Sequence, residues 1–351
     1  MKKIIFVSQS LRRGGAERIV SLLSQEFNRI GFDVKIVLFA NEIEYDYSGE
    51  IINMETPASK SYIVKIFRLF QRTYKLKQIF KKERPDYIFS FMESSNFASI
   101  LTGKKVVVSI HNNPNIKLKS YQKYLIQKLY NFKNVKKVIT VSKGIEKILN
   151  NEYYINNTQV IYNPVNFNNV KDSKKSFNYS NYILSVGRLQ YQKNFELLIN
   201  AYSKTKVSKY VKLLIVGGGD ERNKLLQLIK TLNLEDKVIL TGQVNNVEDY
   251  YKNALFYVLS SRFEGFGNVI AEALYFDLPV ISTNCPFGPN EIIKHMDNGI
   301  LIENENEKQL IEMIDELYFD YDLQGKLKNN GKKSIQHLNV DKIAKKWIDV
   351  I

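Results

Sequence analysis

The sequence predicts an α/β fold with two doubly wound, Rossmann-like domains that face each other across a cleft. Short apolar segments alternate with amphipathic segments of helical period through both halves of the 351 residues. Strands that alternate with helices in this way form parallel sheets covered by helices. Glycine-containing turns join strands to the helices that follow them, as at Gly14 and Gly267. The length suits two domains of ordinary size.

The first half of the chain follows this alternation. Strands are expected at Ile4–Ser8, Asp33–Phe39, Pro85–Phe91, Lys104–Ile110 and Lys136–Ser142. Helices are expected from Ala16 to Phe27, within Ser61–Arg84 as one helix or two, over Lys117–Tyr130, and after Ser142 as far as Leu149. The polar run Asn168–Ser180 predicts a linker, so we expect one domain over residues 1–170.

The second half repeats the pattern, which predicts a second domain over residues 171–338. Strands are expected at Tyr182–Val186, Lys237–Val244 and Ala254–Leu259, and a strand, glycine turn and helix at Val211–Ile229. Further helices are expected from Asn194, over Val247–Ala254, over Glu307–Phe319 and over Leu323–His337. Residues 339–351 form a tail.

Composition narrows the class of protein. Apolar residues make up 44% of the chain, which is enough for a sizeable core. The single cysteine, Cys285, excludes a disulfide framework within the chain. No stretch approaches the roughly 20 apolar residues that span a bilayer. The start reads as a buried strand rather than a signal peptide, because its apolar run is only Ile4–Val7. We therefore expect a cytoplasmic protein.

The net positive charge of the chain lies in its first half. Residues 1–171 hold 28 Lys and Arg against 13 Asp and Glu, whereas residues 172–351 hold 23 of each. Ser61–Arg84 and Lys117–Lys147 interleave cations with Phe, Tyr, Ile and Leu. This pattern predicts docking on an anionic membrane surface, at the inner face of the cell membrane. The alternatives are a solvated helix face, and nucleic acid, for which no recognised binding module appears.

One stretch, Ser260–Glu272, predicts the ligand site. It reads as the end of a strand, a turn with two glycines, and a helix with Asn268 as N-cap. Helix starts at this edge of a parallel sheet bind anions. The carboxylates of Glu264 and Glu272 suit hydrogen bonds from sugar hydroxyls. The alternative interpretation is that Glu264 caps the helix and Glu272 is solvated.

Two other strand-to-helix loops carry groups suited to phosphate. The Gly14–Gly15 turn lets backbone N–H groups approach a phosphate closely. The loop after Tyr182–Val186 holds Arg188, whose planar fork binds phosphate, and Lys193, a compact point charge. The alternative for both cations is simple solvation.

Several motifs together resemble the retaining glycosyltransferases of family 4. The signature is EGFGNVIAE at residues 264–272, followed by PVISTNCPFGPNEII from residue 279 and NGILIE from residue 298. GR…KN at 187–194, GGAER at 14–18 and VIYNPVN at 160–166 extend the match. The resemblance implies the GT-B fold, with the tail crossing back to the N-terminal, acceptor-side domain. The C-terminal domain would bind the nucleotide-sugar.

The resemblance also implies roles for single residues. Glu264 would hold the donor sugar with His111 opposite it, and Arg188 and Lys193 would clamp the diphosphate. His111 follows a predicted strand, at the edge of the sheet where ligands bind. A lone histidine is more often structural than catalytic, and the resemblance is what favours the catalytic role here.

Nucleotide binding would complete the site. The N–H of Gly15 and the helix start at Gly267 and Asn268 would face the diphosphate, and Glu272 would hold the ribose hydroxyls. Arg188, Lys193, the Gly15 N–H and the helix start can stabilise the leaving nucleoside diphosphate, so neither a metal nor a cofactor is expected. No covalent nucleophile stands out, which favours attack on the front face of the sugar. The leaving phosphate would then assist deprotonation of the acceptor.

The implied function is transfer of a hexose or N-acetylhexosamine, from a UDP-sugar, to a glycan or polyprenyl-diphosphate-linked acceptor. The stretch PVISTNCPFGPNEII resembles bacterial enzymes that build surface polysaccharides such as O-antigen and capsule. A sugar-nucleotide epimerase or hydrolase of the same fold is one alternative, and a non-catalytic scaffold is another. The sequence does not specify the donor sugar, the linkage or the oligomeric state.

Overall fold

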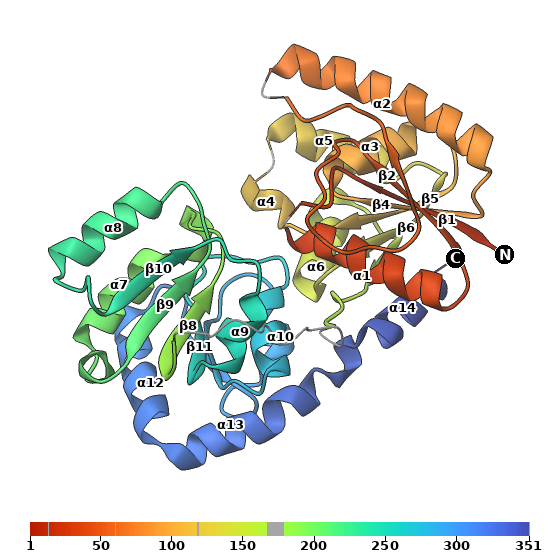
Figure 1. Ribbon diagram of the computed structural model, residues 1–351. Helices are drawn as coiled ribbons and strands as arrows, with labels where there is room; N and C mark the ends of the chain where they lie inside the picture. The colour runs from red at the N-terminus through yellow and green to blue at the C-terminus, as the bar shows by residue number, and fades with distance from the viewer. Residues whose placement is uncertain (13, 60, 118, 167–178, 351) are drawn as a thin grey trace. The chain divides into compact units, whose positions relative to one another are not determined.

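A computed structural model describes all residues except 13, 60, 118, 167–178 and 351. The chain forms two compact units (Figure 1). The first consists of Met1–Asn166 together with Leu338–Ile351, and the second of Phe167–His337. The expected boundary at residue 170 and most of the predicted linker lie outside the described residues.

The first unit contains a parallel sheet in the strand order β3-β2-β1-β4-β5-β6-β7. Its strands are β1 (Lys3–Ser8), β2 (Asp33–Leu38), β3 (Glu50–Asn53), β4 (Tyr87–Phe91), β5 (Val106–Ile110), β6 (Val135–Thr140) and β7 (Thr158–Val160). The order reverses between β1 and β4, which pair directly. This is the switch point at which doubly wound sheets bind ligands.

Helices cover both faces of this sheet. They are α1 (Gly15–Arg29), α2 (Tyr62–Glu83), α3 (Glu93–Leu101), α4 (Pro114–Lys117), α5 (Ser120–Leu129), α6 (Lys143–Tyr153) and α14 (Val340–Ile348). Successive side chains of β4 point to opposite faces. Phe91 packs against Trp347 of α14, at a centroid distance of 5.4 Å. The neighbouring Ser90 hydroxyl instead meets Ser99 of α3.

The second unit repeats the same topology with the order β10-β9-β8-β11-β12-β13. Its strands are β8 (Tyr182–Val186), β9 (Lys212–Val216), β10 (Val238–Gly242), β11 (Phe256–Leu259), β12 (Val280–Thr283) and β13 (Ile300–Ile302). Its α-helices are α7 (Phe195–Lys204), α8 (Arg222–Thr231), α9 (Val247–Lys252), α10 (Asn268–Tyr275), α11 (Pro289–Ile292), α12 (Glu307–Phe319) and α13 (Tyr321–Ser334). Its switch point lies between β8 and β11.

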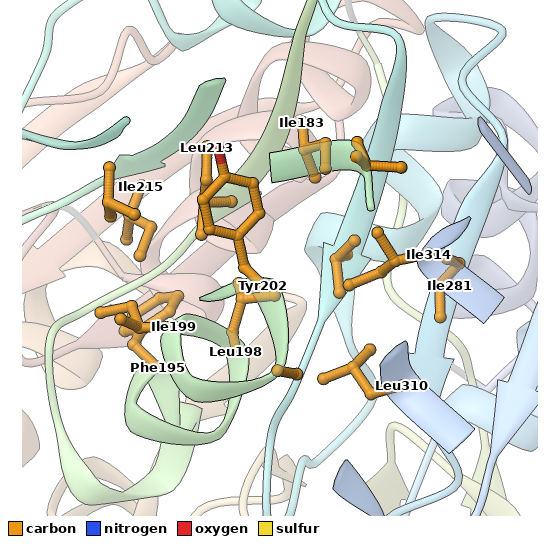
Figure 2. Packing of buried hydrophobic residues seen from close by; sticks show 14 of the residues in the cluster. Ile183, Phe195, Leu198, Ile199, Tyr202, Leu213, Ile215, Ile281, Leu310 and Ile314 are labelled. Atoms are coloured by element: carbon orange, nitrogen blue, oxygen red, sulfur yellow. The ribbon is translucent and has the colours of Figure 1, made fainter. Parts of the chain in front are cut away.

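The core of the second unit shows why these segments fold together (Figure 2). Leu198 and Tyr202 of α7 lie one turn apart and face the sheet, where both are fully buried. Ile183 and Leu213 project from adjacent strands into the same cluster, and Leu310 of α12 enters it as well. Apolar residues of separately predicted strands and helices are thus buried in one shared core. This confirms the doubly wound α/β fold.

Some expectations need correction. Residues 117–130 do not form one helix, because α4 ends at Lys117 and α5 begins only at Ser120. Within Ser61–Arg84, where one helix or two were expected, the chain forms the single helix α2. The sequence also missed α3 and the short strands β3, β7, β12 and β13. Among the described residues, no helix combines the length and the apolar character that crossing a membrane would require.

Candidate active site

Two loops meet at the carboxyl edge of the second sheet, one on each side of its switch point. The loop after β8 runs from Gly187 to Asn194, and the loop after β11 runs from Ser260 to Gly267. The Arg262 N–H donates to the carbonyl of Gln192 at 2.8 Å, and the Ser260 hydroxyl donates to the carbonyl of Lys193 at 2.9 Å. These bonds fix the two loops against each other, although 71 residues separate Gln192 from Phe263.

An ion pair joins two of the predicted catalytic residues of these loops, one from each loop. Nζ of Lys193 lies 2.6 Å from Oε1 of Glu264, and the two side chains are 15% and 8% exposed. The Ser261 hydroxyl donates to the same carboxylate oxygen at 2.6 Å, and Gln192 donates to Oε2 at 3.4 Å. The carboxylate is therefore held in place by three side chains. Charge-assisted bonds of this kind are among the stronger ones in proteins.

The backbone of Glu264 is fixed as well. Its N–H donates to the carbonyl of Pro286 at 2.7 Å, and the N–H of Phe287 donates to its carbonyl at 3.1 Å. The chain that follows β12 is thus hydrogen-bonded to the backbone of Glu264. Burial, with a contribution from the charge of Glu264, raises the pKa of the Cys285 thiol to about 12. The only cysteine is therefore a buried, protonated thiol rather than a nucleophile.

Arg188 differs from Lys193 in its surroundings. Its side chain is exposed, and within the described ranges no ion-pair partner is found for it. The loop that carries it is packed tightly on the glycine turn after β9. A Cβ on Gly217, where φ is 143°, would lie 1.9 Å from the carbonyl oxygen of Gly187. Only glycine allows this close approach, which holds the Arg188 backbone at the edge of the sheet.

The helix α10 begins one residue earlier than its predicted cap implied. Gly267, not Asn268, is the N-cap, with φ of 92°, and Asn268 is the first helical residue. Glycine adopts this left-handed conformation without the steric cost that a side chain imposes. The cap is Gly267, and the Glu264 carboxylate contacts Lys193, Ser261 and Gln192, so the alternative in which Glu264 is the N-cap residue is wrong. The start of α10 directly follows the Glu264 loop, as predicted.

Glu272 lies in the second turn of α10 and is buried. Only 7% of the residue is exposed, so the alternative in which it is solvated is wrong. The hydroxyl of Tyr251, from α9, donates to its Oε2 at 3.0 Å. The Tyr251 ring stacks on Phe276 at a centroid distance of 5.6 Å and an interplanar angle of 7°. This stacking orients the hydroxyl that positions the carboxylate.

Sequence reasoning missed the side chains that support these groups. Tyr251, Ser261 and Gln192 all contact a predicted site residue, but none was singled out. Tyr257 was missed too, and its hydroxyl donates to the carbonyl of Val186 at 3.3 Å. Burial, together with the charges of Glu264 and Glu272, raises the pKa of Tyr257 far above its usual value. A signal for Ser261 was available, since it lies three residues before Glu264.

The first unit places its two predicted residues at the equivalent edge of its own sheet. His111 directly follows β5, and its ring stacks on Phe91 at a centroid distance of 5.9 Å. Nε2 lies 2.9 Å from the Ser109 hydroxyl, while Nδ1 is buried without a hydrogen-bond partner among the described residues. Burial lowers the pKa of His111 to about 3, so the imidazole is neutral at pH 7. Gly15, the exposed first residue of α1, follows β1.

Comparison with known proteins identifies the family. A model described as glycosyl transferases group 1 matches residues 166–334, and one described as Glycosyltransferase Family 4 matches residues 13–169. A GalNAc-transferase of Campylobacter jejuni, named for an N-acetylgalactosamine-N,N'-diacetylbacillosaminyl-diphospho-undecaprenol substrate, is 30% identical over 98% of each chain. The amylovoran biosynthesis glycosyltransferase AmsD of Erwinia amylovora is 24% identical over 100% of this chain and 99% of its own.

Solved structures confirm the fold. The Anabaena protein HepE, crystallised with UDP-glucose, aligns with a TM-score of 0.82 at 20% identity, over 99% of each chain. Both sheets of the present chain also have the strand order of doubly wound nucleotide-binding domains. The fold is therefore GT-B, as expected. With a relative at 30% identity over nearly its whole length, the chain belongs to the group 1, family 4 glycosyltransferases.

Proposed function

We propose that this glycosyltransferase uses a nucleotide-sugar donor, and that the donor is a UDP-sugar. The observation that carries the proposal is the Lys193–Glu264 pair, fixed at the switch point beside Arg188 and the start of α10. A cation, a carboxylate and a helix start at this edge suit a ligand with both a diphosphate and hydroxyls. The UDP-glucose bound by HepE, a protein of the same fold, supports the choice of nucleotide.

The proposed reaction moves a hexosyl or N-acetylhexosaminyl group with retention of configuration. The bond between the anomeric carbon and the diphosphate oxygen breaks, and a bond from the acceptor oxygen to that carbon forms on the same face. The acceptor proton passes to the leaving diphosphate. Arg188, Lys193 and the N–H groups at Gly267 and Asn268 would stabilise the charge that grows on the diphosphate. This assignment gives no step to a metal ion or cofactor.

The two carboxylates take different parts of the donor in this proposal. Glu264 accepts hydrogen bonds from the donor sugar, and its three side-chain contacts keep it oriented for that task. Glu272 accepts bonds from the ribose hydroxyls through its remaining acceptor capacity, while Tyr251 holds Oε2. Ordering a flexible side chain on binding costs free energy, and a side chain that is already held in place avoids much of that cost. The fixed positions of the two carboxylates therefore support their proposed roles.

The first unit contributes His111 and Gly15. A neutral imidazole whose Nδ1 has no hydrogen-bond partner among the described residues suits a hydrogen bond with a sugar hydroxyl better than a charge interaction. Gly15, at the start of α1, offers a backbone N–H to the diphosphate. Their positions at the carboxyl ends of β5 and β1 support both assignments.

The proposed acceptor is a glycan or a polyprenyl-diphosphate-linked oligosaccharide in bacterial surface polysaccharide synthesis. The named substrate of the Campylobacter relative and the biosynthetic role of AmsD support it. Such an acceptor is anionic and membrane-anchored, and the basic first half of the chain complements it. We place the enzyme at the inner face of the cell membrane, held there in a salt-sensitive manner.

Donor turnover tests the proposal and separates it from the alternatives. UDP release from UDP-sugars should depend on an added acceptor and should persist in excess EDTA. Rapid turnover without acceptor would favour the hydrolase or epimerase instead. No binding of any nucleotide-sugar would favour the scaffold. Loss of activity in EDTA that a divalent ion restores would contradict the metal-free assignment alone.

A further inference from the structure

Helix α2 attaches to the first unit by only one of its faces. Arg72, Leu76 and Phe80 recur every four residues and are buried. The Arg72 guanidinium lies 4.2 Å from the centroid of the Phe39 ring and donates to the carbonyl of Thr56. These contacts, together with the packing of α2 on α3, fix which face of the helix points away from the sheet.

The opposite face presents a continuous apolar stripe to solvent. Ile63, Phe67, Phe70 and Tyr74 recur at spacings of three and four residues, so they lie in one row. They are 79%, 65%, 66% and 64% exposed. We call these four residues the α2 stripe. Scattered exposed apolar residues are ordinary, but a row of large ones over three helical turns marks an interaction surface.

Cations are concentrated on the helix that carries the α2 stripe. The helix contains seven Lys and Arg residues and a single acidic one, Glu83, at its last position. The exposed lysines are Lys65, Lys77, Lys81 and Lys82. An exposed apolar row on a helix rich in lysine is typical of helices that lie in the plane of a membrane interface.

We propose that the α2 stripe inserts among the lipids of an anionic membrane surface. The aromatic rings would enter the boundary between headgroups and acyl chains, while the lysines contact anionic headgroups. A second copy of the chain would oppose two basic helices, and like charges disfavour that contact. This inference deepens the proposed function, since it names the element that brings the enzyme to a lipid-anchored acceptor. It also goes beyond simple electrostatic attraction, which requires no exposed rings.

Vesicle binding of a polar variant tests the insertion. The double variant Phe67→Ser, Phe70→Ser should keep its fold because both rings are exposed. Its partition onto vesicles of equal parts phosphatidylcholine and phosphatidylglycerol should fall by about tenfold, since two apolar contacts are lost while every lysine remains. Tyr154→Asn is the matched control, with a ring 68% exposed in the same unit and a left-handed backbone that Asn tolerates. Its partition should equal that of the wild type.

A fluorescence experiment locates the inserted residue. The variant Phe70→Trp adds an indole at the centre of the α2 stripe, and the natural Trp347, 2% exposed, serves as the internal reference. Lipids brominated on their acyl chains should quench the added emission while leaving that of the wild-type protein unchanged. Binding without quenching would show that α2 touches only headgroups, and this would overturn the proposal.

Two further outcomes would also overturn it. Equal vesicle binding by the double variant and the wild type would assign membrane contact to another surface. A wild-type dimer that the double variant dissociates would assign the α2 stripe to a second copy of the chain. Neither measurement requires sugar transfer, so the proposal can fail while the transferase assignment holds. Conversely, donor binding can fail while vesicle binding persists.

Discussion

Nζ of Lys193 lies 2.6 Å from Oε1 of Glu264, so the cation assigned to the donor diphosphate and the carboxylate assigned to the donor sugar form one ion pair. The two residues come from loops after the neighbouring strands β8 and β11. Both side chains are mostly buried. Removing one charge therefore leaves the other without its partner, and the effects of substitution should extend beyond ligand binding.

Lys193→Ala should lower both stability and turnover. The free energy of unfolding should fall by about 3 kcal/mol, the low end for breaking a buried pair, because Ser261 and Gln192 still donate to the carboxylate. Urea titration measures this loss. Turnover should fall further than substrate affinity, since the diphosphate charge grows in the transition state. Arg188→Ala is the matched control: its side chain is exposed, so turnover should fall with stability unchanged. A Lys193→Ala protein as stable as the wild type would show that the pair is weak.

Glu272→Ala should weaken donor binding by roughly 2–4 kcal/mol, through the loss of hydrogen bonds between two hydroxyls and a charged acceptor. Tyr251→Phe should weaken it by a smaller amount, because the carboxylate stays but loses the hydroxyl that orients it. Calorimetric titration with UDP compares the two variants. An unchanged dissociation constant in Glu272→Ala would remove the ribose assignment.

Gly217→Ala should destabilise the second unit by roughly 2–4 kcal/mol, since the new Cβ meets the Gly187 carbonyl and the backbone is left-handed. Gly325→Ala is the matched control. It lies within helix α13, has no atoms near its missing Cβ, and should stabilise the protein by about 0.5–1 kcal/mol. Thermal unfolding of both variants tests this prediction. An unchanged stability in Gly217→Ala would mean that the loop after β8 is not tightly packed on the turn after β9.

His111 should make stability depend on acidity. Its pKa is about 3 in the folded chain, against about 6.5 for an unperturbed histidine. Between these values the unfolded chain binds a proton that the folded chain does not, so the free energy of unfolding falls as the pH falls. His111→Asn should reduce this slope by about 1 kcal/mol per pH unit, below the full 1.4 because part of the residue is exposed. Parallel slopes for the two proteins would show that His111 titrates normally.

The alternation of strands and helices was predictable because most of these segments are long enough to show the apolar repeat of a strand or a helix. The strands β3, β7 and β13, of four, three and three residues, are too short to show a period. The break between α4 and α5 was missed for a related reason, since the apolar spacing of 117–130 runs through it. In the first unit, Met92 caps α3 with a positive φ of 71°, a conformation that its residue type does not suggest.

Motifs in the sequence single out candidate site residues one by one, but they do not specify how those residues are arranged. Lys193 and Glu264 were each found from their motifs, yet their contact depends on β8 and β11 being neighbours, which no local pattern specifies. Gly267 and Asn268 are both acceptable caps by residue type, and backbone conformation decided between them. Tyr251 lies in a helix where nothing distinguishes a tyrosine that positions a carboxylate from one that fills a core.

The most direct test of the central claim, that the edge between β8 and β11 binds a nucleoside diphosphate without a metal, is calorimetric titration of UDP in excess EDTA. The wild-type protein should bind UDP, Arg188→Ala should bind it more weakly by roughly 1.5–3 kcal/mol for a charged hydrogen bond, and Tyr154→Asn should match the wild type. Absence of binding to UDP, GDP and ADP alike, or equal affinity in the wild type and Arg188→Ala, would contradict the account.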